Sequence, residues 1–229
     1  MQSLDSLIGT IPTDRLNAGL VWLQRLVRNP SNPDVALSYL RSFDSDLHVE
    51  LVRKLKSDPE GRRLLQERPR LDARSLRVDE LARQPSGTLG HALARYFREQ
   101  HVQPFVSRAP IQDDVDYVAN RLRETHDLWH VLTGYGTYPT GEVELQAFSY
   151  GNLGNLSSLV FLSYVPGVDT SKGIESLPGW LGDAYRRGRA CRPLMGVHWE
   201  DHWGTPLAEL REELCKPVRN EPRYDRTTP

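Results

Sequence analysis

Apolar residues recur along most of the chain at intervals of three and four, which is the period of an α-helix with one buried face. Residues 14–28 carry such a stripe, and Thr13 is the expected N-cap. Asn32 and Asp58 each precede a proline, an arrangement typical of a capped first helical turn. No segment shows the apolar–polar alternation of a strand bounded by turns. The pattern therefore predicts an all-α fold.

The same period predicts a long helix over residues 113–133 and another from Glu142 towards residue 164. Gly134 is expected to end the first, because glycine commonly follows the last periodic residue of a helix. The loop over residues 134–141 is rich in glycine and proline, so we expect it to reverse the chain.

Three shorter helices complete the pattern. The first covers residues 91–101 after a turn at residues 86–90. The other two cover residues 178–189 and 206–214, and Thr205 is the expected N-cap of the last.

The predicted helices follow one another without a long linker, so we expect residues 1–215 to form a single multi-helix domain. The last residues, 216–229, combine prolines with many charges and are expected to form a loose C-terminal tail.

The composition is compatible with one globular domain of 229 residues, 38% of them hydrophobic. The formal net charge of -1 provides no overall field that would favour nucleic acid. Basic residues outnumber acidic ones between Arg53 and Arg83, which indicates either a solvated helix face or a surface for anionic lipid head groups or phosphates.

No segment reaches the roughly 20 apolar residues that cross a bilayer, since serines interrupt the longest run at residues 156–165. The N-terminus shows no secretory signal pattern. We therefore expect a cytoplasmic protein. Any membrane association should be peripheral, on the inner (cytoplasmic) face, through residues 53–83 or the amphipathic helix over residues 14–28.

The two cysteines, Cys191 and Cys215, have no CxxC spacing. This excludes a cysteine zinc knuckle and favours a reducing compartment, or thiols without a role.

Candidate chemistry is concentrated around residue 126. On a helix, His126, Asp127 and His130 fall within an arc of about 100°, because successive residues turn by about 100°. Glu142 follows after the reversing loop and can close the site from the start of the next helix. We predict that these four residues bind one divalent metal ion between the two helices. Lone histidines such as His91, His101, His198 and His202 are more often satisfied by ordinary packing.

Two imidazoles and two carboxylates form a ligand set of intermediate hardness. Zinc is the first expectation, iron and manganese are alternatives, and magnesium fits less well because imidazole is a poor magnesium ligand. Four protein ligands would close a tetrahedral zinc shell, whereas a catalytic metal needs an open position.

The motif around the predicted metal site resembles the HDxxH-x11-E signature of the Coq4 family at all four positions, His126, Asp127, His130 and Glu142. The preceding Arg121-x-Arg-Glu also resembles that family. So do the SGTLG turn with its helix over residues 85–97, and Trp199 together with the final helix over residues 205–214. The resemblance covers about residues 40–215.

Membership of that family would imply an all-helical fold and a role in ubiquinone (coenzyme Q) biosynthesis, with a divalent metal, usually taken as zinc, at the four catalytic residues. It would also imply C1 decarboxylation of a polyprenylated hydroxybenzoate, coupled to hydroxylation of that carbon. The expected partners are a polyprenylated aromatic or isoprenoid lipid, a peripheral membrane contact and other quinone-biosynthesis proteins. The oligomeric state is open, with a homodimer among the options.

The segment after Glu142 mixes bulky apolar residues with small ones. Small residues let helices pack closely, which is one interpretation. The other is a slot for an isoprenoid tail that starts at the metal and is lined by Leu145, Phe148, Leu153, Gly154, Ser157 and Val160. Glu124, one turn before the site, either orients an imidazole or is an exposed glutamate.

Two rival functions remain open. One is a non-catalytic isoprenoid-lipid carrier or scaffold whose metal is structural. The other is an HD-type metal phosphohydrolase, which would need His91 or His101 together with Asp169 or Asp183 and would leave Glu142 without a role.

Overall fold

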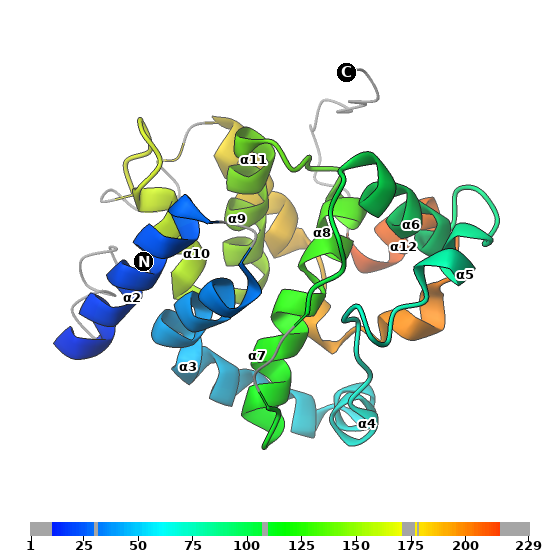
Figure 1. The fold of residues 1–229 in the computed structure, drawn as a ribbon, viewed down its shortest axis with the longest axis horizontal. Helices are drawn as coiled ribbons and strands as arrows, with labels where there is room; N and C mark the ends of the chain where they lie inside the picture. The colour runs from blue at the N-terminus through cyan, green and yellow to red at the C-terminus, as the bar shows by residue number, and fades with distance from the viewer. Residues whose placement is uncertain (1–10, 30–31, 107–109, 171–176, 178, 216–229) are drawn as a thin grey trace.

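The computed structural model describes residues 11–29, 32–106, 110–170, 177 and 179–215, and in these residues it is all-helical (Figure 1). The predicted fold class is therefore confirmed. The helices are α2 (Thr13–Arg28), α3 (Pro33–Ser57), α4 (Pro59–Glu67), α5 (Val78–Ala82), α6 (Leu89–Glu99), α7 (Asp114–Glu124), α8 (His126–Thr133), α9 (Pro139–Leu153), α10 (Leu156–Ser163), α11 (Gly179–Ala190) and α12 (Leu207–Leu214), with short 3₁₀ helices η2 (Leu194–Gly196) and η3 (Trp199–His202).

Two of the predicted caps are present. The Asn32 side chain accepts hydrogen bonds from the backbone N–H groups of Asp34 and Val35, and the Asp58 side chain accepts one from Gly61. The caps predicted at Thr13 and Thr205 are wrong. Helices α2 and α12 follow a proline at the N-cap position, and neither has a side-chain cap bond.

The helix predicted over residues 113–133 is in fact two helices, α7 and α8, which meet at Thr125. The Thr125 hydroxyl donates to the carbonyl of Arg121 at 2.9 Å, a bond that competes with the regular helix ladder and often bends helices. The apolar period continues across the junction, so the sequence pattern does not reveal the break.

The helix predicted from Glu142 towards residue 164 is also divided. Helix α9 begins earlier, at Pro139, and ends at Leu153 because Gly154 adopts a left-handed conformation with φ 73°. Helix α10 then starts at Leu156. Helix α6 likewise begins two residues before its predicted start, with the Thr88 side chain as its cap.

Helices α9 and α11 pack closely because glycines remove side chains from the contact. A Cβ atom on Gly151 would lie 2.2 Å from the carbonyl oxygen of Tyr185, and one on Gly188 would lie 2.1 Å from that of Phe148. Small residues in this part of α9 therefore serve helix packing.

Helix α8 lies at the centre of the largest apolar cluster. Its buried Leu128, Trp129 and Leu132 pack with side chains from α6, α9 and α12. Among the latter are Leu89, Leu93, Phe97, Leu145, Phe148, Leu210 and Leu214. The helix with the two candidate ligand histidines is thus held on several sides.

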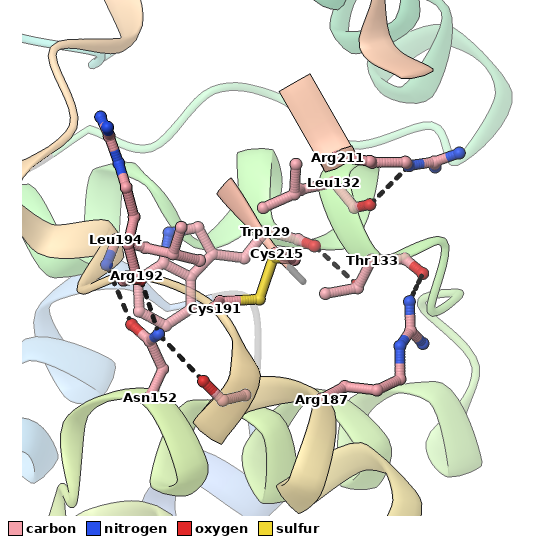
Figure 2. The surroundings of a disulfide bond; sticks show 11 residues. Trp129, Leu132, Thr133, Asn152, Arg187, Cys191, Arg192, Leu194, Arg211 and Cys215 are labelled. Atoms are coloured by element: carbon pink, nitrogen blue, oxygen red, sulfur yellow. Dashed lines mark hydrogen bonds between the residues drawn. A yellow bond between two sulfur atoms is a disulfide. The ribbon is translucent and has the colours of Figure 1, made fainter. Parts of the chain in front are cut away.

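Cys191 and Cys215 form a disulfide that joins the end of α11 to the end of α12 (Figure 2). The expectation of thiols without a role is therefore wrong. Sequence spacing gave no indication of the bond because the two helix ends meet only in the fold, where the Arg192 N–H donates to the Leu214 carbonyl at 2.7 Å.

Arginines from the two linked helices cap the C-terminal end of α8, as Figure 2 shows in part. Arg211 donates to the carbonyls of Leu132 and Val131, and Arg187 donates to that of Thr133. The last carbonyls of a helix have no partner within it, so these bonds fix the position of α8.

Much of the basic segment Arg53–Arg83 is committed to ion pairs. Arg53 pairs with Glu50, Lys56 and Arg68 pair with Asp114, and Arg70 pairs with Glu124. This favours the solvated, paired helix face over a free basic surface. Among the described helices, none is both long and apolar enough to cross a bilayer. The tail predicted over residues 216–229 lies outside the described residues.

Candidate metal centre

Two helices bring three ligand-type side chains to one point. His126 and His130 lie one turn apart on α8, and their Nε2 atoms are 3.2 Å apart. Glu142, in the first turn of α9, places Oε1 3.2 Å from Nε2 of His130 and Oε2 3.5 Å from Nε2 of His126. All the ligand atoms lie within 4.8 Å of one another. The predicted position between two helices joined by the glycine-rich loop is confirmed for these three residues.

The loop between α8 and α9 depends on glycine to deliver Glu142. Gly134 ends α8 with φ 79°, a conformation that side chains rarely adopt. Gly141 lies against the loop backbone, and a Cβ atom there would be only 2.1 Å from the carbonyl oxygen of Gly136. A bulkier residue at position 141 would force the loop open and move Glu142.

The hydrogen bond made by Nδ1 of His130 sets the tautomer of its ring. Nδ1 lies 2.9 Å from the carbonyl oxygen of Tyr135, which can only accept, so Nδ1 carries the hydrogen and donates it. In the neutral ring, Nε2 then presents a lone pair towards His126 and Glu142. This hydrogen bond to a backbone carbonyl is typical of metal-binding histidines.

Charge coupling within the group supports the same arrangement. Burial would raise the pKa of Glu142, but its hydrogen bonds to His126 and His130 outweigh burial and hold that pKa well below its usual range. Burial lowers the pKa of His126. For His130 burial acts in the same direction, but the bond to Glu142 opposes it and the pKa is raised. The carboxylate is therefore ionised beside two imidazoles.

These donors fit a divalent ion. Two imidazole nitrogens and one carboxylate oxygen are the protein ligands of several catalytic zinc sites and of non-haem iron sites, which keep coordination positions open. The His130 side chain is 1% exposed, while those of His126 and Glu142 are 25% and 34% exposed. The group can thus be reached from the His126 and Glu142 side.

Asp127 does not belong to this group of three. Its Oδ1 accepts a hydrogen bond from the Tyr96 hydroxyl at 3.4 Å, and the Tyr96 ring stacks on His130 with centroids 5.7 Å apart. A role for Asp127 as a fourth ligand stays a prediction. The sequence carries no signal for Tyr96, which reaches the site through a tertiary contact, or for Tyr135, which contributes a backbone carbonyl that any residue could supply.

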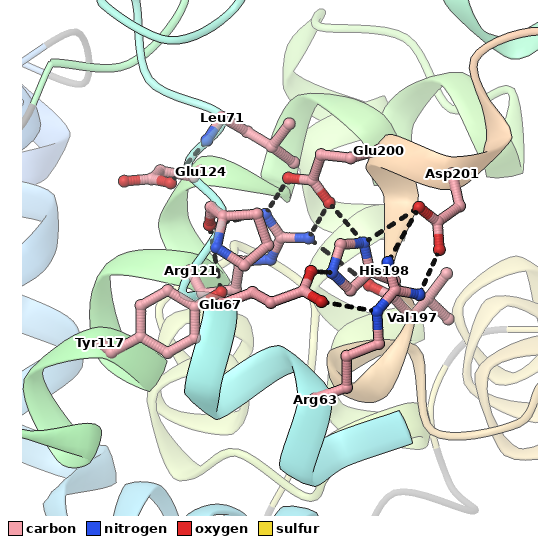
Figure 3. A network of polar contacts seen from close by, with 11 residues as sticks. Arg63, Glu67, Leu71, Tyr117, Arg121, Glu124, Val197, His198, Glu200 and Asp201 are labelled. Carbon is pink, nitrogen blue, oxygen red and sulfur yellow. Dashed lines mark hydrogen bonds and ion pairs between the residues drawn. The ribbon is translucent and has the colours of Figure 1, made fainter. Parts of the chain in front are cut away.

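Glu124 plays neither of the roles that the sequence suggested. Its side chain is fully buried, forms an ion pair with Arg70 and accepts a hydrogen bond from the Leu71 N–H at 2.9 Å. It belongs to a network around α7 (Figure 3).

The six positions predicted to line a lipid slot lie in different surroundings. Leu145 and Phe148 are buried in the cluster around α8, with Leu153 packed at its edge. Ser157 donates to Asp44 of α3, Val160 packs on α2 and α3, and Gly154 is an exposed helix end. The structure does not bring the six together on one wall.

The residues required by a phosphohydrolase are also apart from the centre. In the described part of the chain, the group of potential ligands contains His126, His130 and Glu142, and not His91, His101, Asp169 or Asp183. Glu142 bonds to both imidazoles. A phosphohydrolase would leave this residue without a role, whereas here it is part of the group.

Comparison with known families gives one match over most of the chain. Residues 27–217 match the model of the coenzyme Q (ubiquinone) biosynthesis protein Coq4. Among similar curated proteins is the mitochondrial ubiquinone biosynthesis protein COQ4 homolog of Xenopus tropicalis, which is 34% identical over 72% of this chain and 60% of its own length. The mitochondrial COQ4 protein of Komagataella phaffii is 31% identical over 81% of this chain and 63% of its own length.

A solved structure supports the fold. The crystal structure of a protein from Nostoc punctiforme assigned to ubiquinone biosynthesis is 28% identical, with a TM-score of 0.69 over 90% of this chain and 98% of that chain. The chain thus spans under two thirds of the length of the two curated relatives and nearly all of the bacterial one.

Proposed function

The chain belongs to the Coq4 family of coenzyme Q (ubiquinone) biosynthesis proteins, and from that premise we propose that it decarboxylates a polyprenylated hydroxybenzoate at C1 with a divalent metal bound at His126, His130 and Glu142. The coupled hydroxylation that the family implies would need dioxygen and a two-electron reductant from outside the chain, with the second oxygen atom leaving as water, whereas decarboxylation alone needs neither. Zinc remains the first expectation for the metal, and iron, which also uses two histidines and one carboxylate, is the main alternative.

The convergence of three ligand atoms on one half-exposed point carries this proposal. A bound ion would act there as a Lewis acid that stabilises the negative charge developing as carbon dioxide leaves. Three protein ligands leave room for a substrate, whereas a structural zinc is normally closed by four. The open set therefore favours an enzyme over a carrier or scaffold with a structural metal.

The neighbouring side chains have roles that follow from their bonds. Tyr135 holds His130 in the tautomer that exposes Nε2. Burial, together with the nearby charge of Asp127, raises the pKa of Tyr96, so its hydroxyl stays protonated at neutral pH. That hydroxyl is a proton donor beside the centre, and Asp127 holds it in place. Such a donor would supply the proton that C1 takes up when carbon dioxide leaves without hydroxylation of that carbon.

The test is a joint measurement of metal content and carbon dioxide release on the full chain with a short-chain 3-prenyl-4-hydroxybenzoate labelled in the carboxyl group, in air and without oxygen. Wild type should contain about one divalent ion and release labelled carbon dioxide. Glu142→Gln should lose both. Glu99→Gln, which changes an exposed glutamate of α6, is the control and should lose neither.

Retention of the metal without any carbon dioxide release by wild type would contradict the enzyme proposal and support the carrier. A full complement of metal in Glu142→Gln would contradict the ligand assignment.

A further inference from the structure

Arg123 is a partly buried cation, three residues before His126 of the metal group. It lies in the last turn of α7, and its Nη1 atom is buried without a hydrogen-bond partner in the described residues. Other arginines of this region pair with carboxylates, although the Nε atom of Arg121 is also buried without a partner. Arg121 forms two bonds to Glu200, and Arg70 pairs with Glu124. Leaving a guanidinium nitrogen dry and unpaired is unfavourable, so such a group suggests a ligand that supplies the acceptor.

The charge of Arg123 acts on the metal centre. Burial is the largest cause of the lowered pKa of His126, and the charge of Arg123 adds to it. The same charge opposes the rise in the pKa of Tyr96 that burial produces. Arg123 therefore lies near one candidate ligand and near the tyrosine that stacks on the other.

The carboxylates of the site do not neutralise Arg123. Asp127, four residues further on, accepts from Tyr96, and Glu142 is engaged by the two imidazoles. Among the ion pairs of the described residues, none involves Arg123. Its guanidinium instead lies 4.9 Å above the ring of buried Phe105, which orients the group without satisfying its N–H donors.

We propose that Arg123 binds the carboxylate of the aromatic acid whose decarboxylation is proposed above, and so holds that acid beside the metal group. The inference rests on the proposed function. A guanidinium matches a carboxylate with two parallel hydrogen bonds, and a bond to a charged partner is strong in a partly buried site. Because the carboxylate is lost in the reaction, Arg123 would bind the substrate and not the decarboxylated product.

The experiment compares binding of short-chain 3-prenyl-4-hydroxybenzoate with binding of 2-prenylphenol, its decarboxylated counterpart, to the metal-loaded full chain. Arg123→Gln should weaken binding of the acid by about 10- to 100-fold, the loss expected for a hydrogen-bonded charge, and change binding of the phenol less than twofold. Metal content should be unchanged. Arg95→Gln, which changes an exposed arginine of α6, is the matched control and should alter neither.

Arg123→Lys provides a second variant if glutamine prevents folding. It keeps the charge but loses the planar fork, so it should weaken binding of the acid by roughly tenfold. In turnover, both variants should raise KM for the acid more than they lower kcat, because carboxylate binding is made before the reaction.

Equal losses for the acid and the phenol would show that Arg123 only shapes the site, and would overturn the inference. Unchanged binding of the acid in both variants, or no binding of the acid by wild type, would overturn it too. Tight, Arg123-dependent binding of the acid without carbon dioxide release would refute the proposed reaction and leave the binding role standing. Release of carbon dioxide with an unchanged KM in Arg123→Gln would do the reverse.

Discussion

Two clusters of charged side chains lie on consecutive helices, one around α7 and one around α8, and their charges are arranged in opposite ways. In the first, Arg121 is fully buried and donates to both carboxylate oxygens of Glu200, at 2.6 and 2.8 Å (Figure 3). Glu124 of the same cluster pairs with Arg70. Each charge meets an opposite charge from the same chain. In the second, two imidazoles and a carboxylate converge, and the group is partly exposed.

The difference is that the α8 cluster needs an added cation, whereas the α7 cluster does not. The α7 cluster combines donors with acceptors, so its charges are balanced within the chain. In the α8 cluster, Nδ1 of His130 already donates to Tyr135, so the nitrogen that faces His126 and Glu142 is an acceptor. This nitrogen and the carboxylate oxygen of Glu142, 3.2 Å apart, are two acceptors that need a cation between them, either a proton or a metal ion. Paired charges are typical of an ion-pair network that stabilises the fold. Ligand atoms without a counter-charge are typical of a binding site.

The largest expected effect is on the unbalanced cluster. His126→Ala should reduce affinity for a divalent ion by more than about 1,000-fold, because a lost ligand costs more than a lost partner of a ligand, which costs 10- to 100-fold. Stability of the metal-free protein should change little, since the His126 side chain is partly exposed. Metal titration and urea unfolding of the same preparation would measure both.

Glu200→Gln is the matched control for His126→Ala, and its metal stoichiometry should equal that of wild type. Wild-type metal affinity in His126→Ala would contradict the prediction that the α8 cluster binds a metal ion through His126.

A smaller effect is expected when the balanced cluster is broken. Glu200→Gln leaves the buried charge of Arg121 without its counter-ion and should lower the free energy of unfolding by about 3 kcal/mol, the lower end of the range for buried pairs, because Glu200 is 21% exposed. Urea unfolding would give the value. A loss of metal binding in the folded variant would mean that the two clusters are coupled and not separate.

The disulfide is expected to contribute less. Replacing Cys191 and Cys215 by alanine should lower the free energy of unfolding by about 2 kcal/mol. This is less than the roughly 3 kcal/mol that chain entropy gives for a loop of 24 residues, because the Arg192–Leu214 hydrogen bond still holds the helix ends together. Metal affinity should stay within twofold, since the arginine bonds that fix α8 remain. Thermal unfolding with and without reductant would measure the change, and the double variant should not respond to reductant.

Three of the four residues predicted to bind a metal, all but Asp127, lie together, and their grouping could be predicted from the sequence because its geometry is almost entirely local. His126 and His130 share a helix face through their spacing alone, and a loop with glycines at fixed places delivers Glu142. The balanced cluster could not be predicted. Arg121 and Glu200 are 79 residues apart, so only the fold brings them together. The division of the predicted helix into α7 and α8 at Thr125 could not be predicted either, because the apolar period continues across this residue.

The last prediction concerns Gly154 and whether the substrate-binding region extends along α9 as far as this residue. This glycine ends α9 with φ 73°, and a Cβ atom there would meet nothing within 4 Å. Gly154→Ala should therefore lower the free energy of unfolding by about 1 kcal/mol, because left-handed backbone costs an alanine about 1–2 kcal/mol and the stiffer unfolded chain returns part of that. Gly167→Ala is the matched control, with φ 82° and the same open surroundings, and should lose a similar amount. Neither variant should change metal content or binding of a short prenylated acid. Weaker binding of a long-chain acid in Gly154→Ala alone would instead place the lipid tail at the end of α9. The substrate-binding region would then extend well beyond the metal group.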